Sequence, residues 1–233
     1  MNFRLQAINQ HWKILATGRP GELSTLVLDP ACRRPALWIL TICAGTAIYG
    51  ASIGAWQGPQ MAIYVGLKLP LVVFLTLTVN SLLNGLLGRL LGSGLGFKDT
   101  FSALLVSFSI FSLIVGSLSP ISLGMALDTP GPDSPQSGQV HRSLILFHIV
   151  LISFAGITAT RQLWGLLRSV SSSAAARRTL FGWLAGNLFV GAQMGFLLRP
   201  IFGQPGLTIE FLRPDMFEGN FYESVWWALK HIF

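Results

Sequence analysis

Charged residues are scarce in this chain of 233 residues, and their scarcity excludes most soluble folds. Asp, Glu, Lys and Arg together make up 11% of the sequence, whereas 52% of the residues are hydrophobic. A soluble domain carries about 25% charged residues. A chain with so few charges cannot cover a water-exposed surface of its size, so the composition indicates a membrane protein.

Cysteine is almost absent, and the four histidines are scattered. Cys32 and Cys43 show no CxxC spacing and have no histidine beside them, so we expect neither a disulfide between them nor a metal site. The histidines form no HExxH motif, and Walker and GxGxxG patterns are missing. The sequence therefore predicts no metal, no cofactor and no enzymatic activity.

The long apolar stretches contain no Asp or Glu. This absence disfavours carriers coupled to protons or sodium ions, because such carriers rely on carboxylates inside the membrane. The net charge of +7 does not indicate nucleic-acid binding either. The basic residues stand at the ends of apolar runs instead of gathering on one soluble face.

Five apolar runs meet the length of about 20 residues that a bilayer-spanning helix needs. The predicted spans are 36–56, 61–87, 101–127, 143–160 and 179–198. They form a transmembrane domain over 36–198, between a cytoplasmic segment (1–35) and an external segment (199–233). The predicted fold class is an all-α membrane protein, a five-transmembrane-helix bundle.

Basic residues are distributed unevenly between the two sides of this bundle. One side holds eleven of them, and the other side holds four or five, depending on where Lys68 is placed. Because Lys and Arg mark the cytoplasmic side, we expect a cytoplasmic amino terminus and an external carboxyl terminus. The richer side, which we expect to be cytoplasmic, holds Arg4, Lys13, Arg19, Arg33, Arg34, Arg89, Lys98, Arg161, Arg168, Arg177 and Arg178.

Two segments outside the spans have the apolar spacing of amphipathic helices. One contains Leu5, Ile8, Trp12 and Leu15, and the other contains Phe221, Val225, Leu229 and Ile232. We predict an amphipathic amino-terminal helix and an external amphipathic cap. The cap favours two functions equally, a lid over the bundle or a docking surface for a partner subunit. The interface candidates are Arg199, Arg213, Phe221, Tyr222, Trp226 and Trp227.

Glycines recur at four-residue steps within the spans or at their ends. Such faces let helix backbones approach closely in lipid, and the alternative is a hinge in a moving transporter. The glycines expected to pack between helices are Gly50, Gly54, Gly88, Gly92, Gly182, Gly186, Gly191 and Gly195.

Five polar side chains fall inside the spans: Asn80, Asn84, His148, Asn187 and Gln193. Asn80 and Asn84 are four residues apart and share one helix face. These residues either form hydrogen bonds between helices or line a small polar cavity for a solute or a lipid headgroup.

The stretch GASIG, Gly50 to Gly54, matches the GxSxG motif of serine hydrolases. It lies inside an apolar run, where the strand-to-helix turn of that motif is not expected. An intramembrane serine hydrolase with Ser52 and His148 as a dyad is therefore a remote alternative.

From Val79 to Ile121 the sequence joins an apolar helix, a Gly-rich turn, the stretch GFKDTF and a second apolar helix that meets a proline. This pattern resembles the Yip1-like family of polytopic membrane proteins, and the whole chain is similar to bacterial membrane proteins without an assigned activity. The resemblance implies five spans, a cytoplasmic amino terminus and a bacterial cytoplasmic (inner) membrane. It implies no catalytic residue.

The sequence favours a non-enzymatic scaffold or accessory subunit of a membrane complex. Its expected partners are the lipid bilayer and other membrane subunits or further copies of the chain, with no nucleic acid. The first alternative is a passive permease or a lipid- or solute-binding membrane protein.

Overall fold

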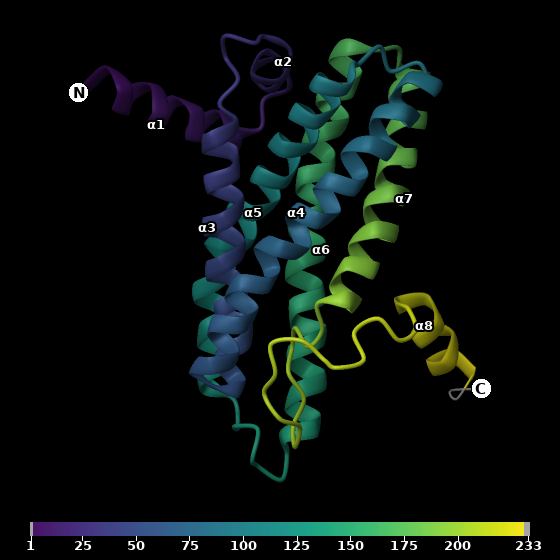
Figure 1. Ribbon diagram of the computed structural model, residues 1–233. Coiled ribbons are helices and arrows are strands. Elements are labelled where there is room, and N and C mark those ends of the chain that lie inside the picture. Colours follow the sequence, from purple (N-terminus) through teal and green to yellow (C-terminus); the bar gives the residue numbers. More distant parts are fainter. Residues whose placement is uncertain (1, 231–233) are drawn as a thin grey trace.

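The structure, a computed structural model, describes residues 2–230, and the side chains of 2–8, 20, 225 and 227–229 lie outside its description. Within residues 2–230 all regular structure is helical, and no strand is present. Figure 1 shows five long helices side by side, with α1 and α2 at one end and α8 near the other. In chain order the helices are α1 (Asn2–Thr17), α2 (Pro20–Leu28), α3 (Pro35–Gly54), η1 (Ala55–Gln57), α4 (Pro59–Leu90), α5 (Phe97–Asp128), α6 (Ser137–Val170), α7 (Ser173–Leu197) and α8 (Phe221–Lys230).

The predicted fold class is confirmed: α3 with η1, α4, α5, α6 and α7 are each long and apolar enough to cross a membrane. The helices α4, α5 and α6 have 32, 32 and 34 residues. At 1.5 Å per residue they are about 50 Å long and extend beyond a hydrocarbon core of about 30 Å. The spans expected from the sequence are shorter because only the apolar middle of each helix carries a strong sequence signal.

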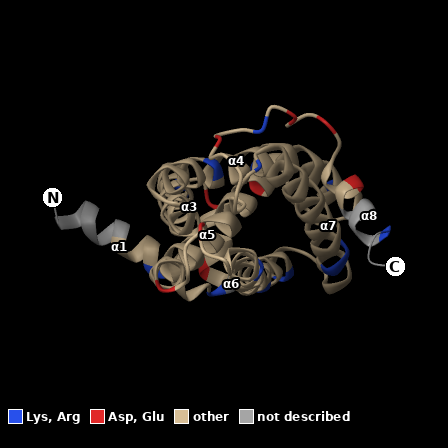
Figure 2. Ribbon diagram, turned by 90° about the horizontal axis from the view of Figure 1, so that it is seen from below, with Lys and Arg blue, Asp and Glu red and all other residues tan. Residues whose placement is uncertain are grey.

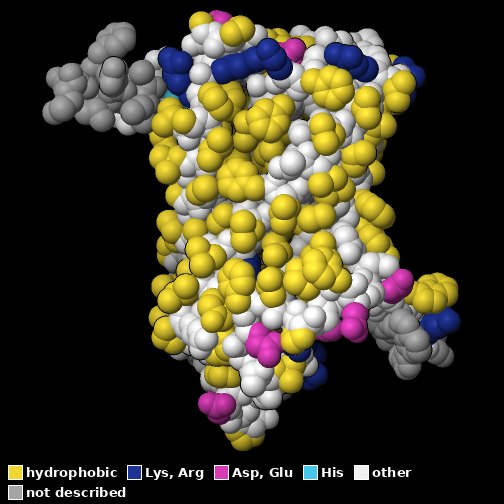
Figure 3. Space-filling view, viewed as in Figure 1, with side chains coloured by type: hydrophobic (Ala, Val, Ile, Leu, Met, Phe, Trp, Pro, Cys, Tyr) yellow, Lys and Arg dark blue, Asp and Glu magenta, His cyan; other side chains and the backbone are white. Residues whose placement is uncertain are grey.

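Apolar side chains cover the outside of the bundle between its two ends (Figure 3). Leu82, Phe181 and Leu188 on this surface are 63–65% exposed. Exposed apolar surface of this extent is rare on soluble monomers, and it fits contact with the acyl chains of a bilayer. Figure 3 also shows Lys and Arg in a band at one end of the bundle, with Asp and Glu gathered at the other.

Helix α3 packs against both α4 and α5 at backbone distance. A Cβ atom added at Gly50 would lie 2.5 Å from the backbone oxygen of Val65, and one at Gly54 would lie 2.4 Å from that of Met61. Only glycine fits such contacts, which is the packing role expected for this pair. The closest approach to a backbone atom, Gly45 against the backbone oxygen of Ser112, lies outside the predicted set.

The other predicted packing glycines differ in how closely they are approached. Gly88 accommodates the Trp183 ring, while Gly182, Gly186, Gly191 and Gly195 have ordinary side-chain neighbours. Gly92 has a different place from the one expected. It follows the end of α4 with φ +75°, and a Cβ added there would have no neighbour within 4 Å. Glycine at position 92 therefore permits the positive φ angle of the turn between α4 and α5.

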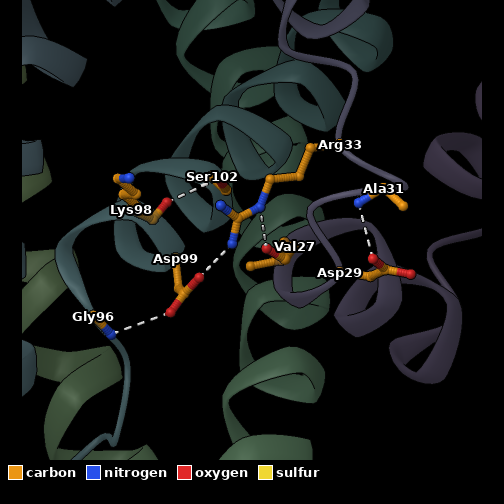
Figure 4. Close-up of polar contacts among 8 residues, drawn as sticks. All are labelled: Val27, Asp29, Ala31, Arg33, Gly96, Lys98, Asp99 and Ser102. Atoms are coloured by element: carbon orange, nitrogen blue, oxygen red, sulfur yellow. Dashed lines mark hydrogen bonds and ion pairs between the residues drawn. The ribbon is translucent and has the colours of Figure 1, made fainter.

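The amino-terminal helices are fixed to the basic end of the bundle by specific side chains. Arg33 forms an ion pair with Asp99 at the start of α5 and donates from Nε to the backbone oxygen of Val27 on α2 at 2.8 Å (Figure 4). Leu15 of α1 is buried. The predicted amphipathic stripe also includes Leu5 and Ile8, whose side chains lie outside the described residues, so its contact with a leaflet stays a prediction.

The segment between α7 and α8 crosses the opposite end of the bundle (Figure 1). Ile201, Phe202 and Ile209 pack against a buried apolar cluster that includes Tyr49 and Met61. Acidic and basic residues alternate along this segment, as the view of that end shows (Figure 2). The segment therefore packs against this end of the bundle, and whether it acts as a lid or as a docking surface stays a prediction.

Candidate functional site

The five predicted polar residues lie at three separate places. Asn80, Asn84 and Asn187 meet where α4 packs against α7. His148 on α6 bonds to α3, and Gln193 near the end of α7 accepts a hydrogen bond from the first residue of α8. The five side chains therefore do not line one common cavity, although three of them are brought together.

The contact between α4 and α7, here the α4–α7 seam, is defined by Asn80, Asn84, Trp183, Gly186 and Asn187. Asn84 Nδ2 donates to Asn187 Oδ1 at 3.2 Å, and Trp183 Nε1 donates to the backbone oxygen of Asn84 at 2.9 Å. A Cβ added at Gly186 would lie 3.4 Å from Oδ1 of both Asn80 and Asn84. Both amide atoms of Asn80 and Oδ1 of Asn84 are buried with no hydrogen-bond partner among the described residues.

His148 and Ser52 each have other partners. His148 Nδ1 lies 3.0 Å from the Tyr49 hydroxyl, and its ring contacts Phe202. Ser52 Oγ donates to the Tyr49 backbone oxygen at 2.6 Å and approaches Ser122 Oγ at 2.7 Å. Within residues 2–230 no hydrogen bond joins Ser52 to His148. A void of about 10 Å³ beside His148 holds at most about one water molecule.

Lys68 is a buried cation inside α4. Its side chain has no exposed surface, and its Nζ donates to the backbone oxygen of Pro200 at 2.7 Å. The Phe211 ring lies 5.3 Å from the same atom. Within residues 2–230 no carboxylate forms an ion pair with it. Buried charges are normally paired, because their desolvation is unfavourable.

A cavity of about 410 Å³ lies at the end of the bundle where α7 stops. We call it the carboxyl-end cavity. Pro200, the hydrogen-bond partner of Lys68, belongs to its wall. The lining residues are Phe196, Arg199, Pro200, Ile201, Phe202, Gly203, Gln204, Arg213, Asp215 and Ser224.

The charges around this cavity are unbalanced. Arg199 pairs with Asp215 at 3.1 Å, and this hydrogen bond is the largest cause that lowers the Asp215 pKa below its ordinary value. Arg213 takes part in none of the three ion pairs among the described residues. The lining therefore holds two arginines and one carboxylate, and this local excess of positive charge favours an anion.

The predicted interface residues on α8 contact α7 and remain accessible. The Tyr222 hydroxyl donates to the Phe189 backbone oxygen at 2.7 Å, and the two rings stack with centroids 4.6 Å apart. Phe221 is 36% exposed and Trp226 60% exposed. The Trp227 side chain lies outside the described residues.

Sequence reasoning placed Lys68 near a boundary but did not join it to Arg199 and Arg213. A lysine inside an apolar run is the signal that points to such a site. Among the described residues no group of His, Cys, Asp and Glu is arranged to hold a metal ion. No family model matches the chain, and no curated protein or solved structure matches it significantly.

Proposed function

We propose that this multi-pass membrane protein binds a phosphate-bearing anion, foremost the headgroup of an anionic lipid, in the carboxyl-end cavity. The observation that carries this proposal is the fully buried Lys68 ammonium, which donates to the cavity-wall residue Pro200 and has no carboxylate partner among the described residues. Its field adds to those of Arg199 and Arg213. An anion in the cavity supplies a countercharge that Lys68 does not receive from any described residue.

Arg213 is the residue best suited to hold the anion directly. Its guanidinium lines the cavity and has no ion-pair partner in the described part of the chain. A guanidinium presents several N–H donors in one plane, and these match the oxygens of a phosphate. Arg199 is already held by Asp215, so it contributes charge and shapes the wall.

A lipid is favoured over a free solute because the cavity combines charge with apolar walls. Phe196, Ile201 and Phe202 line it beside the two arginines. It adjoins the end of α7, whose outer surface carries the exposed Leu188 and Phe189. A headgroup in the cavity leaves its acyl chains free to lie along this surface.

Binding is tested with the full chain in nanodiscs of phosphatidylcholine to which phosphatidylglycerol is added. We expect saturable binding that Arg213→Gln weakens by about tenfold, the effect of losing a charged hydrogen bond. Arg142→Gln is the matched control, because Arg142 is exposed near the same end, at the start of α6, and does not line the cavity. Equal binding by all three proteins overturns the proposal. Inorganic phosphate in place of the lipid distinguishes a solute site from a lipid site.

An accessory-subunit role is the second candidate, and the exposed aromatic residues of α8 favour it. Phe221, Tyr222 and Trp226 are 36–60% exposed on a short helix at the end of the bundle. Aromatic side chains are enriched in protein interfaces. Trp226→Ala should then release a co-purified membrane subunit or dissociate a self-assembled oligomer. Unchanged composition and mass of the purified complex would count against this role.

The orientation, the bacterial cytoplasmic membrane and the Yip1-like family are further proposals. The band of Lys and Arg at the end that holds α1 and α2 supports a cytoplasmic amino terminus. The family proposal rests on the Val79–Ile121 pattern. Labelling of single cysteines by a membrane-impermeant reagent tests the orientation, and a label at Gly131→Cys from the cytoplasmic side would reverse it.

A further inference from the structure

We infer that α7 has a second register on α4, one helical turn from the present one, in which Asn187 pairs with Asn80 instead of Asn84. This shift carries α7 along α4 and changes the carboxyl-end cavity. Its regulatory consequence rests on the proposed anion binding, whereas the shift itself rests on the α4–α7 seam alone.

The seam offers two equivalent partners for one side chain. Asn80 and Asn84 are both fully buried on α4, and both direct Oδ1 toward Gly186 of α7. Asn84 bonds to Asn187, whereas both amide atoms of Asn80 lack a partner among the described residues. Four residues of helix correspond to about 6 Å. If α7 slides along α4 by that length, Asn80 takes the position beside Asn187 that Asn84 occupies in the present register.

The contact surface of α7 permits such a slide. Gly182, Gly186 and Gly191 face α4 with no neighbour closer than 3.2 Å to an added Cβ. Among the five spans α7 is the least buried inside the protein. Helix interfaces of small residues in lipid are held by packing and a few hydrogen bonds, and not by a hydrophobic driving force between the helices.

Trp183 explains why the present register is preferred. Its fully buried ring lies against Gly88, 3.4 Å from the position of an added Cβ, and its Nε1 bonds to the backbone oxygen of Asn84. A slide of one turn brings the ring to the level of Asn84, whose side chain is larger than glycine. Truncation of Asn84 therefore acts twice. It removes the Asn84–Asn187 hydrogen bond, and it leaves space beside α4 for the Trp183 ring in the shifted register.

The direction of the slide connects the seam with the cavity. Because α4 and α7 are antiparallel neighbours, pairing of Asn187 with Asn80 moves α7 toward its own carboxyl end. Arg199, two residues beyond α7, then moves about 6 Å relative to Lys68 on α4. Pro200 moves with Arg199, so the 2.7 Å bond from Lys68 Nζ to the Pro200 backbone oxygen breaks and the charges at the cavity are rearranged.

Two disulfide pairs distinguish the registers in the full chain carrying Cys32→Ser and Cys43→Ser. A Cβ at Gly191 would lie 3.7 Å from Thr76 Cγ2, so Thr76→Cys with Gly191→Cys reports the present register. Val72→Cys with Gly191→Cys reports the shifted one. We expect the present pair to dominate in the parent protein, and Asn84→Ala to raise the yield of the shifted pair several-fold.

The variants Asn80→Ala and Asn187→Ala test whether the shifted register depends on an Asn80–Asn187 hydrogen bond. With either added to Asn84→Ala, the gain of the shifted pair should fall, because no Asn80–Asn187 bond can form and only the space opened for the Trp183 ring remains. An unchanged pair ratio in Asn84→Ala protein that elutes as a single folded species overturns the second register. A ratio that rises equally with and without Asn80 also overturns it.

Lipid binding is then compared between proteins locked by each disulfide. Weaker phosphatidylglycerol binding in the shifted form supports regulation of the cavity, and equal binding in both forms overturns that coupling while the register itself stands. Absence of binding in every form contradicts the proposed function without affecting the cross-linking result.

Discussion

Trp38 on α3 donates its indole N–H to Nε2 of His11 on α1 at 2.7 Å, and both side chains are buried. This bond requires a neutral His11, because a protonated imidazole has no acceptor at Nε2. Burial, and to a smaller degree the Arg34 charge, lower the His11 pKa below its ordinary value of 6.5. The amino-terminal helix is thus docked through a group that titrates near physiological pH.

The attachment of α1 should depend on pH. Undocked His11 binds a proton below about pH 6.5, whereas docked His11 stays neutral to a lower pH, so docking weakens as pH falls through this window. Above about pH 7.5 it should be constant. A spin label on the exposed position Gln10→Cys, in protein without its native cysteines, should become mobile on acidification. His11→Gln keeps an acceptor without titrating, and a mobility change that persists in this variant would contradict the assignment.

The Arg33–Asp99 ion pair should protect the chain between α2 and α3. Its two side chains are 19% and 30% exposed and join segments 66 residues apart. Asp99→Asn should therefore accelerate tryptic cleavage after Arg33, because Arg33 then loses its ion-pair partner. The matched control is Glu22→Gln, which breaks the exposed Arg19–Glu22 pair and should leave cleavage after Arg33 unchanged, since exposed pairs contribute little. Equal acceleration by both variants would argue against a protective role of the pair.

Close packing of α3 on α4 should make Gly50 sensitive to a single methyl group. Gly50→Ala introduces a Cβ at 2.5 Å from a backbone oxygen, and we expect it to lower the free energy of unfolding by about 1–3 kcal/mol. Gly124→Ala on α5 is the control, because a Cβ there has no neighbour within 4 Å. Thermal unfolding in detergent compares the two, and a similar melting temperature for both would refute backbone contact at Gly50.

Much of the fold follows from the sequence for a physical reason. In lipid the backbone must satisfy its own hydrogen bonds, so an apolar run of about 20 residues has to be a helix, and run length alone yields five spans. The shared face of Asn80 and Asn84 follows from helical periodicity in the same way. Which helix lies against that face does not, because helix order in the bundle is set by packing.

The candidate site depends on contacts that no local pattern encodes. Lys68 meets Pro200 across 132 residues of sequence, and Asn84 meets Asn187 across 103. His148 and Gln193 resemble the three asparagines in polarity, yet they bond to α3 and α8. Gly92 fits the four-residue glycine spacing but lies in a turn. Spacing identifies candidates, and tertiary packing decides which of them meet.

Phosphatidylglycerol should stabilise the protein through Lys68. A ligand present at 100 times its dissociation constant stabilises the folded state by about 2.7 kcal/mol, which raises the melting temperature of a chain of this size by about 5–10 °C. Lys68→Met removes the buried charge and should abolish most of this shift. Arg142→Gln should retain it. If phosphatidylglycerol raises the melting temperature of Lys68→Met by the full amount, lipid binding does not depend on the buried ammonium.

Native mass spectrometry of the full chain, released from its membrane in mild detergent, tests anion binding most directly. We expect the chain to retain a phospholipid mass, and Arg213→Gln to lose it while Arg142→Gln keeps it. A chain that carries no lipid and instead retains a stoichiometric protein subunit would contradict headgroup binding and favour the accessory role.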